Sequence, residues 1–238
     1  MAKLTLGIDT SGAVSVAVSD GCQVLARRMD ERARHHDEVL LDMIDAVLDE
    51  TGSSRADISC VVGGRGPGPF TGLRVGLVTA RSIASVLGAR LIGLPSLDAI
   101  ALEAAERCPE AKTIAVALDA RRREVYWALY EVSGEGSDAS PRHIVRTFEP
   151  GVAAPADIAS SLMAADVLVG SGAHLYPEIL PPTGELRHAD AGSLIRAAFS
   201  AEERGEDLSS TEPLYLREAD AAKPKRRKSA LGLGDRPA

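Results

Sequence analysis

Two stretches, LTLGIDTSGAVSVAV (residues 4–18) and TIAVALDARRREVYWALY (residues 113–130), follow the same pattern. Each begins with an apolar run, has an aspartate where that run ends (Asp9 or Asp119), and passes through a polar turn into a second run of alternating apolar residues. Such alternation is typical of a strand with one buried face, so each stretch predicts a hairpin. Helical segments and a further short apolar run follow each copy, and the sequence therefore predicts two related α/β units.

The segment VVGGRGPGPFTGLRVG (residues 61–76) leads from an apolar run into a long helical pattern. Glycines before a helix expose backbone N–H groups near the positive end of the helix dipole, which favours an anion site. A tight turn without any ligand uses the same residues. Neither standard phosphate motif fits, because GxxxxGK[ST] lacks its lysine and GxGxxG matches only loosely. Both interpretations remain open from the sequence alone.

The helix predicted over residues 72–87 has a stripe of small residues at every fourth position, namely Gly72, Gly76, Ala80 and Ala84. Such a stripe lets another backbone approach closely. Arg74 and Arg81 interrupt the apolar run, whereas a membrane span needs about 20 mostly apolar residues, so we expect no membrane partner. Apolar residues occupy most other directions, which indicates burial on more than one side. We expect the chain's own domain to bury only part of this helix.

The preceding helical pattern, HHDEVLLDMIDAVLDETG (residues 35–52), has an apolar face wider than the seam of a coiled coil. We expect Gly52 to form its C-cap. A half-buried core helix accounts for this face, and so does a helix that also meets another protein chain.

Composition and charge indicate an ordinary globular protein that is acidic except for a basic C-terminal segment. The chain has 238 residues, 45% of them hydrophobic, and its three widely spaced cysteines favour a reduced cytoplasmic setting. We expect no export, because the first apolar run breaks at Asp9 and does not form the apolar region of a signal peptide. From Lys223 onward six basic residues accompany one acid, against 21 basic and 33 acidic residues before it. We expect residues 223–238, which include KPKRRK, to be a disordered basic tail, either simply solvated or in contact with nucleic-acid phosphates.

Five motifs together resemble the TsaB/YeaZ family, bacterial proteins of tRNA threonylcarbamoyladenosine synthesis. They are LGIDTS (6–11), GRGPGPFTGLRVGL (64–77), LIGLPSLDA (91–99), ALDARRREVYWALY (117–130) and PLYLR (213–217). The resemblance covers nearly the whole chain up to Arg217. The family usually has Ser where Pro69 stands, and the KPKRRK tail is outside its pattern.

This resemblance implies an α/β fold of duplicated RNase H-like units, the actin-like ATPase (ASKHA) fold. We expect the first unit over residues 1–100, joined by a helix near 208–218, and the second over 101–207. The resemblance also implies pairing with a TsaD-like paralogue, which transfers threonylcarbamoyl to the tRNA adenosine beside the anticodon, together with a TsaE-like ATPase. The chain would contact tRNA through this complex, and alone it could form a homodimer.

In the family, the helices that match residues 35–52 and 72–87 form the paralogue interface. This agrees with the wide apolar face and the small-residue stripe of these two helices, and we therefore expect the interface to include Val39, Leu40, Met43, Val47, Gly72, Leu73, Gly76 and Ala80.

The catalytic paralogue holds a metal through an HxxxH pair, where two histidines one helical turn apart share an ion. The matching region here, LPSLDAIALEA (94–104), has no histidine, and the adjacent His35 and His36 point to different faces of a helix. We therefore expect no metal site, which also removes the chemistry of a metalloprotease.

Residues that could contact a nucleotide are Asp9, Thr10, Ser11, Gly66 and Gly68. In the second copy of the turn, arginines 121–123 stand where backbone would have to approach phosphate. Together with these residues, the resemblance implies a noncatalytic partner and activator of the transferase, with no cofactor bound by the chain alone and ATP or ADP at the complex interface. The alternative is a stand-alone actin-like ATPase, kinase or hydrolase.

Overall fold

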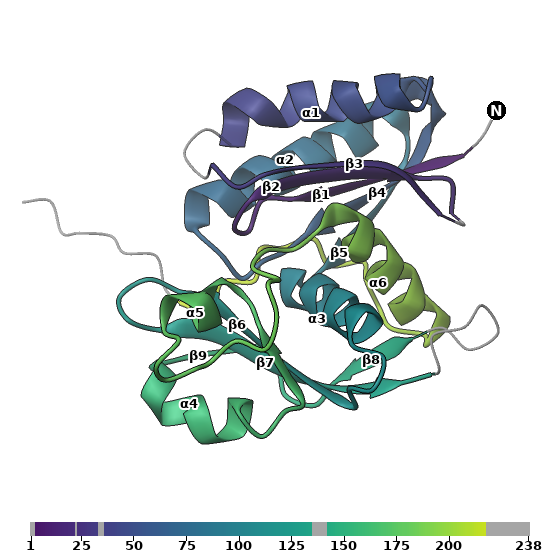
Figure 1. Ribbon diagram of the computed structural model, residues 1–238. Coiled ribbons are helices and arrows are strands. Elements are labelled where there is room, and N and C mark those ends of the chain that lie inside the picture. The colour runs from purple at the N-terminus through teal and green to yellow at the C-terminus, as the bar shows by residue number, and fades with distance from the viewer. Residues whose placement is uncertain (1–2, 22, 33–35, 135–141, 218–238) are drawn as a thin grey trace, which may run out of the picture.

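A computed structural model describes residues 3–21, 23–32, 36–134 and 142–217 (Figure 1). The expected basic tail over residues 223–238 and His35 lie outside this part of the chain. Two five-stranded sheets form the framework, with helices on both faces of each sheet.

The first sheet contains β1 (Leu4–Asp9), β2 (Val14–Ser19), β3 (Val24–Asp30), β4 (Ile58–Gly64) and β5 (Arg90–Leu94), in the spatial order β3-β2-β1-β4-β5. The first three strands form an antiparallel meander, whereas β4 and β5 run parallel to β1. Every residue of β1 and β2 is buried because helices cover both faces of this sheet.

The second sheet contains β6 (Thr113–Asp119), β7 (Val125–Ser133), β8 (His143–Arg146), β9 (Gly151–Ala153) and β10 (Val167–Val169). Its order is β10-β6-β7-β8, with β9 also paired to β7. The β6-β7 hairpin repeats the β1-β2 hairpin, and β10 pairs with β6 in parallel as β4 does with β1. The predicted pair of related α/β units is thus confirmed, and the chain has the actin-like fold.

The helices form three layers around these sheets (Figure 1). They are α1 (His36–Glu50), a 3-10 turn η1 (Arg55–Asp57), α2 (Phe70–Leu87), α3 (Ser96–Arg107), α4 (Pro155–Leu162), α5 (Ser171–Leu175) and α6 (Ala191–Glu203). Helices α1 and α2 cover the outer face of the first sheet, and α4 and α5 cover the outer face of the second. Helices α3 and α6 pack against each other between the sheets.

Helix caps are visible at three of these helices, and one of them was predicted. The predicted C-cap Gly52 has a left-handed φ of 63° after α1. The Asp190 carboxylate accepts a hydrogen bond from the Ser193 N–H and so caps the start of α6. Pro69 precedes α2 and supplies no side-chain cap.

The expected domain boundaries need two corrections. No helix forms over 208–217; this segment is extended along the first unit, where the Gly93 N–H donates to the Leu208 carbonyl. The helix that returns to the first unit is α6, whose Ala191 carbonyl lies against Gly7 of β1. Helix α3 packs on the second sheet, so the first unit ends at β5 rather than at residue 100.

A buried polar cluster attaches α3 to the second sheet. The Asp98 carboxylate accepts hydrogen bonds from the Tyr130 hydroxyl (2.7 Å) and from the Arg146 guanidinium (2.9 and 3.2 Å). Burial raises the pKa of Asp98, and the neighbouring Arg146 opposes that effect. Burial likewise raises the pKa of Tyr130, which stays a hydrogen-bond donor. The three side chains satisfy one another, as buried polar groups must.

Helix α2 is long and apolar enough, by length and composition, to cross a bilayer, with 33% of it buried inside the chain. This is weak evidence for a span, because the core helix of a globular protein passes the same test. In the structure α2 lies against β4 and β1.

Candidate functional site

A cleft of about 510 Å³ opens between the two units, where the β1-β2 turn faces the β6-β7 turn. The polar side chains that line it are those of Ser11, Glu31, Thr71, Asp119, Arg121, Ser171 and His188. Clefts between units at the carboxyl ends of strands are common ligand sites.

The carboxylate of Asp9 is buried beneath the cleft and is fully engaged. It accepts hydrogen bonds from the Ser11 N–H (2.8 Å), the Ser11 hydroxyl (2.6 Å) and the Ser96 hydroxyl at the start of α3. Burial raises its pKa, while the bonds from Ser11 and Ser96 act in the opposite direction. With 1% of its surface exposed, Asp9 holds the turn together rather than facing a ligand.

Thr10, the next residue of the turn, attaches it to α2. Its hydroxyl donates to the Gly72 carbonyl (2.7 Å) and accepts from the Gly76 N–H (3.2 Å). A Cβ on Gly76 would lie 2.2 Å from the Thr10 hydroxyl oxygen, so only glycine allows this contact. The small-residue stripe of α2 therefore faces the chain's own first sheet.

The glycine-rich loop packs equally closely on the same turn. A Cβ on Gly64 would lie 1.9 Å from the Asp9 carboxylate, and one on Gly68 would lie 2.3 Å from the Ser11 carbonyl oxygen. Gly66 has a left-handed φ of 89° and is buried against Leu73. Close internal packing thus accounts for these glycines. Of the five predicted nucleotide contacts, Asp9, Thr10, Gly66 and Gly68 are occupied by this packing, and Ser11 alone lines the cleft.

His188 covers the first turn from the other side of the cleft. A Cβ on Gly12 would lie 2.6 Å from the imidazole Nδ1, which means that the ring rests on the glycine backbone. Burial lowers the pKa of His188 below its usual value of 6.5, with smaller opposing effects of Glu31 and Asp9. The imidazole is therefore uncharged at neutral pH. It sits where an anion would have to approach the turn, and no local motif in the sequence marks it.

The turn between β6 and β7 has a strained backbone and is exposed to solvent. Arg121, Arg122 and Arg123 have φ values of 61°, 52° and 64°, a conformation that costs a residue other than glycine about 1 kcal/mol or more. The Asp119 carboxylate supports the turn by accepting from the Arg121 N–H (2.7 Å) and pairing with its guanidinium (3.1 Å). All three arginines are exposed. As predicted, the three arginines lie in the turn where the backbone would have to approach a phosphate.

Most residues assigned to a partner interface lie inside the chain. Leu40, Val47, Gly72, Leu73, Gly76 and Ala80 are buried in its core, and Val39 and Met43 are partly buried. For the six buried residues the assignment is corrected, because they contact other parts of the first unit, namely its core, the Thr10 hydroxyl or the glycine-rich loop. The same two helices expose Leu41 (53%), Val78 (60%) and Val86 (83%) instead. Helical periodicity alone did not tell the inner stripe from this outer surface.

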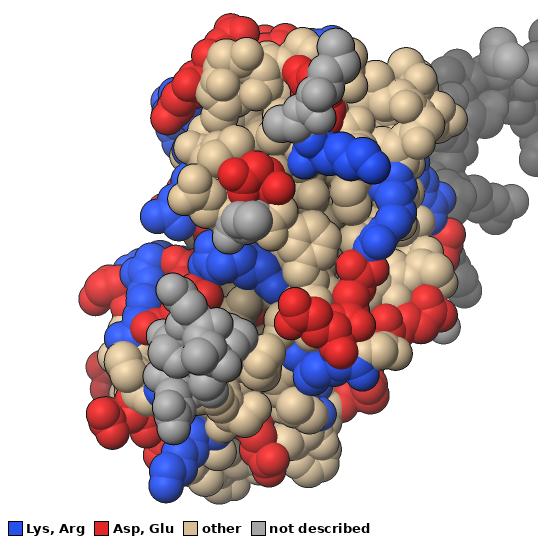
Figure 2. Space-filling model, turned by 90° about the vertical axis from the view of Figure 1, so that its right-hand side faces the viewer, with Lys and Arg blue, Asp and Glu red and all other residues tan. Residues whose placement is uncertain are grey.

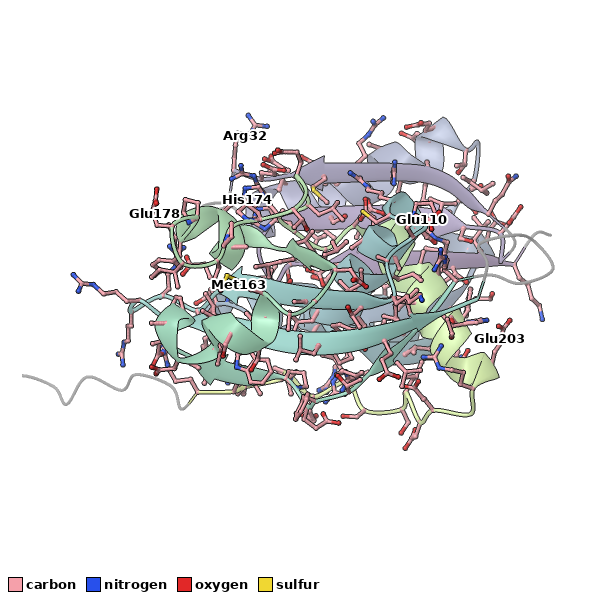
Figure 3. The ribbon with its side chains drawn as sticks, turned by 60° about the horizontal axis from the view of Figure 1, so that its bottom comes forward. Arg32, Glu110, Met163, His174, Glu178 and Glu203 are labelled. Carbon is pink, nitrogen blue, oxygen red and sulfur yellow. The ribbon has the colours of Figure 1, made fainter. Side chains whose placement is uncertain are left out.

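The three histidines other than His35 and His36 have different surroundings in the structure. His174, on the short helix α5 in Figure 3, has its Nε2 3.0 Å from the Gly184 carbonyl oxygen. The Nδ1 of His143 lies 2.8 Å from the Ser200 hydroxyl on α6, and His188 covers the cleft. Among the residues that the structure describes, no group of three or more His, Cys, Asp or Glu side chains could hold a metal ion. The absence of a metal stays a prediction.

Comparison with known proteins gives consistent matches. The family model for TsaD, tRNA N6-adenosine threonylcarbamoyltransferase, matches residues 24–158. An uncharacterized protein of Mycobacterium tuberculosis is 37% identical over 201 residues, which are 83% of this chain and 82% of that protein. The tRNA threonylcarbamoyladenosine biosynthesis protein TsaB of Escherichia coli is 40% identical over 134 residues, which are 55% of this chain and 56% of that protein.

A solved structure, YeaZ from Pseudomonas aeruginosa, superposes with a TM-score of 0.74 at 27% identity. The match covers 90% of this chain and 100% of that one. The similarity in fold thus extends over both units.

Proposed function

The chain belongs to the TsaB/YeaZ family, and from that membership we propose that it takes part in the synthesis of threonylcarbamoyladenosine in tRNA. Its role in this proposal is that of a noncatalytic partner that activates a TsaD-type transferase. A TsaE-like ATPase joins the pair, and the chain contacts tRNA as part of this complex. ATP or ADP binds only where the subunits meet, and the isolated chain pairs with itself.

The observation that carries the noncatalytic role is the occupation of the first turn by the chain's own atoms. Thr10 is bonded to α2, Gly68 lies against Ser11, and the uncharged His188 rests on Gly12. A phosphate approaching the backbone of this turn would have to displace that ring. Because bound phosphates require exposed N–H groups, the turn is a poor nucleotide site as it stands.

The outer surface of α1 and α2 is suited to a protein partner. Leu41, Val78 and Val86 expose apolar side chains on neighbouring helices that pack on one face of the first sheet (Figure 1). An apolar surface of this kind on paired helices favours association with another helical surface. In this proposal the TsaD-like paralogue covers the outer residues of the two helices, and the inner stripe only fixes α2 to its own sheet.

The proposal is tested by binding between this chain and the TsaD-type subunit from the same cell. Leu41→Arg and Val78→Arg place charge on the outer surface of α1 and α2 without touching the core. Met163→Arg, an exposed apolar position on the other unit (51% exposed), is the matched control. We expect the first two variants to lose partner binding by at least tenfold while melting like the wild type, and Met163→Arg to bind normally. Unchanged binding in Leu41→Arg and Val78→Arg would contradict the interface.

The alternative of a stand-alone ATPase, kinase or hydrolase rests on the size of the cleft. Its volume of about 510 Å³ is in the range of small-molecule sites. Isothermal titration of the purified chain with ADP and magnesium separates the two functions. Binding in the micromolar range that is lost in Ser11→Trp would favour the alternative, and the proposed role predicts no measurable binding.

A further inference from the structure

The last described segment of the chain joins the two units. Residues 208–217 are extended along the first unit, and the final residue, Arg217, contacts the second. Its guanidinium donates to the Ala120 carbonyl (3.0 Å) and pairs with the Glu124 carboxylate. In Figure 1 the yellow segment passes between the two sheets and ends beside the turn that joins β6 and β7. This connection is separate from the packing of α3 on α6.

The segment is attached to the first unit by several contacts. The Leu214 N–H donates to the Arg65 carbonyl (2.8 Å), and the Arg65 Nε donates to the Glu212 carbonyl (2.8 Å). The Tyr215 ring stacks on Phe70, at the start of α2, with centroids 5.1 Å apart. The contact with the second unit, by contrast, is made by a single guanidinium, and a partly exposed ion pair contributes little to stability. The segment therefore detaches first at its last residue.

Both attachments lie directly behind walls of the cleft. On α2, Thr71 lines the cleft, and the preceding residue Phe70 stacks on Tyr215. In the β6-β7 turn, Arg121 lines the cleft between the two residues that Arg217 holds. Tyr215 and Arg217 are two residues apart, which is at most about 7 Å of extended chain. The two walls therefore cannot move far apart while both contacts hold.

Arg217 also supports the strained backbone of the β6-β7 turn. Its partners flank residues 121–123, with Ala120 immediately before them and Glu124 immediately after. The turn itself is closed by only two backbone hydrogen bonds, from the Ala120 N–H to the Glu124 carbonyl (3.1 Å) and from the Glu124 N–H to the Arg121 carbonyl (3.0 Å). Backbone strain of this kind persists only where the surrounding contacts determine it. Release of Arg217 thus frees the turn together with its wall of the cleft.

We propose that residues 214–217 form a latch. With Arg217 bound to the β6-β7 turn, the latch holds the cleft at its present width, and release of Arg217 opens the cleft. The packing of α3 on α6 is then the pivot on which the units move. The latch consists only of contacts within this chain, so it does not depend on the proposed transferase partner.

Arg204, at the end of α6, provides a matched control for Arg217. It donates to the Ser200 carbonyl (3.1 Å) and pairs with the Glu206 carboxylate (2.6 Å). Its side chain is 27% exposed, against 22% for Arg217. Helix α6 ends at the right of Figure 1, on the face shown in Figure 2, where basic and acidic side chains lie among one another. Because both partners of Arg204 lie in α6 or directly after it, this arginine makes the same bonds without joining the units.

The first measurement is the exchange of backbone amide protons in the full chain, followed by NMR. Arg217→Gln should speed exchange of the Ala120 and Glu124 N–H groups about tenfold, because the bonds that hold both ends of the turn are lost. Arg204→Gln should leave both rates unchanged. The reversed pair, Glu124→Arg combined with Arg217→Glu, restores the ion pair and should recover part of the protection.

The second measurement is the width of the cleft, from the distance between spin labels at positions 32 and 178. Arg32 belongs to the first unit and is 90% exposed, and Glu178 is exposed on the second; both are labelled in Figure 3. A ketone-bearing amino acid carries each label, so the native cysteines stay in place. Arg217→Gln should add a population longer by about 5 Å or more, because the two-residue connection no longer limits the separation. Arg204→Gln and the reversed pair should keep the wild-type distance.

An unchanged distance in Arg217→Gln, or an equal increase in Arg204→Gln, would overturn the proposal. If the Ala120 and Glu124 amides exchanged faster while the distance stayed the same, Arg217 would only support the turn and the latch would be wrong. Glu124→Gln keeps the bond to the Ala120 carbonyl and should shift both measurements in the same direction by a smaller amount. This variant gives the decisive result if Arg217→Gln melts below the assay temperature, and a wild-type distance in it would then contradict the latch.

Discussion

The substitution Gly76→Ala tests the inward orientation of the α2 stripe. The added methyl would lie 2.2 Å from the Thr10 hydroxyl oxygen, which is held by bonds to Gly72 and Gly76. Overpacking of this kind costs about 1 to 3 kcal/mol, and the displaced hydroxyl loses hydrogen bonds worth about 1 kcal/mol each. The better helix propensity of Ala returns about 1 kcal/mol. We expect a net loss of about 2 kcal/mol, or a Tm lower by about 4 to 8 °C in a chain of this length.

The assay is urea unfolding combined with thermal melting of the isolated chain. Ser82→Ala, on the exposed side of the same helix, is the control and should change stability by less than about 0.5 kcal/mol. Thr10→Ala removes the obstructing hydroxyl, so the double variant should be less destabilised than the sum of the two single variants by about 1 kcal/mol or more. Wild-type stability for Gly76→Ala, or additive effects in the cycle, would refute the contact. If Gly76→Ala instead lost only partner binding, the stripe would face outward.

Three further predictions concern the arginine turn, the cleft and the α3 cluster. Arg123→Gly should raise the Tm by about 1 to 3 °C, because glycine adopts the φ of 64° without strain; a lower Tm would contradict the strain. Because burial lowers the folded-state pKa of His188, its stabilising effect is present above the usual value of 6.5 and is lost as the pH falls through the lower folded value. Urea unfolding from pH about 7 to about 5 should therefore show falling stability that is reduced in His188→Gln, and identical profiles would exclude His188 as the cause. Asp98→Asn should cost about 3 kcal/mol because it leaves the Arg146 charge poorly paired, whereas Tyr130→Phe should cost about 1 kcal/mol; equal losses in urea unfolding would argue against a charge effect.

The sequence predicted the hairpins and the two units because those features depend on local patterns. Alternation of apolar residues after Asp9 and after Asp119 reflects burial on one side of a strand, and the structure has both hairpins in these positions. The C-cap at Gly52 is likewise a local signal. Each needed only the residues beside it in the chain.

The orientation of the α2 stripe could not be predicted in this way. Gly76 is spaced for close approach, but its neighbour is Thr10, 66 residues earlier in the chain. Periodicity identifies a face of a helix without identifying what covers it. The same limit explains why six buried residues were assigned to a partner and why the exposed Leu41 and Val86 were not.

The C-terminal part of the first unit shows the same dependence on distant contacts. A helix was expected near 208–218, whereas the structure has an extended segment tied to Arg65 and Gly93, and α6 returns to the first sheet. His188 was missed as a site residue because it follows no motif and acts only by lying on Gly12.

We propose that this chain activates a transferase without performing the chemistry itself. The most direct test is a reconstituted tRNA threonylcarbamoylation assay containing the TsaD-type subunit, the TsaE-like ATPase and the carrier substrate, with each protein omitted in turn. We expect modified tRNA only when this chain and the TsaD-type subunit are both present, and none from this chain when the TsaD-type subunit is omitted. Modification at an unchanged rate without this chain, or by this chain in the absence of the TsaD-type subunit, would contradict it.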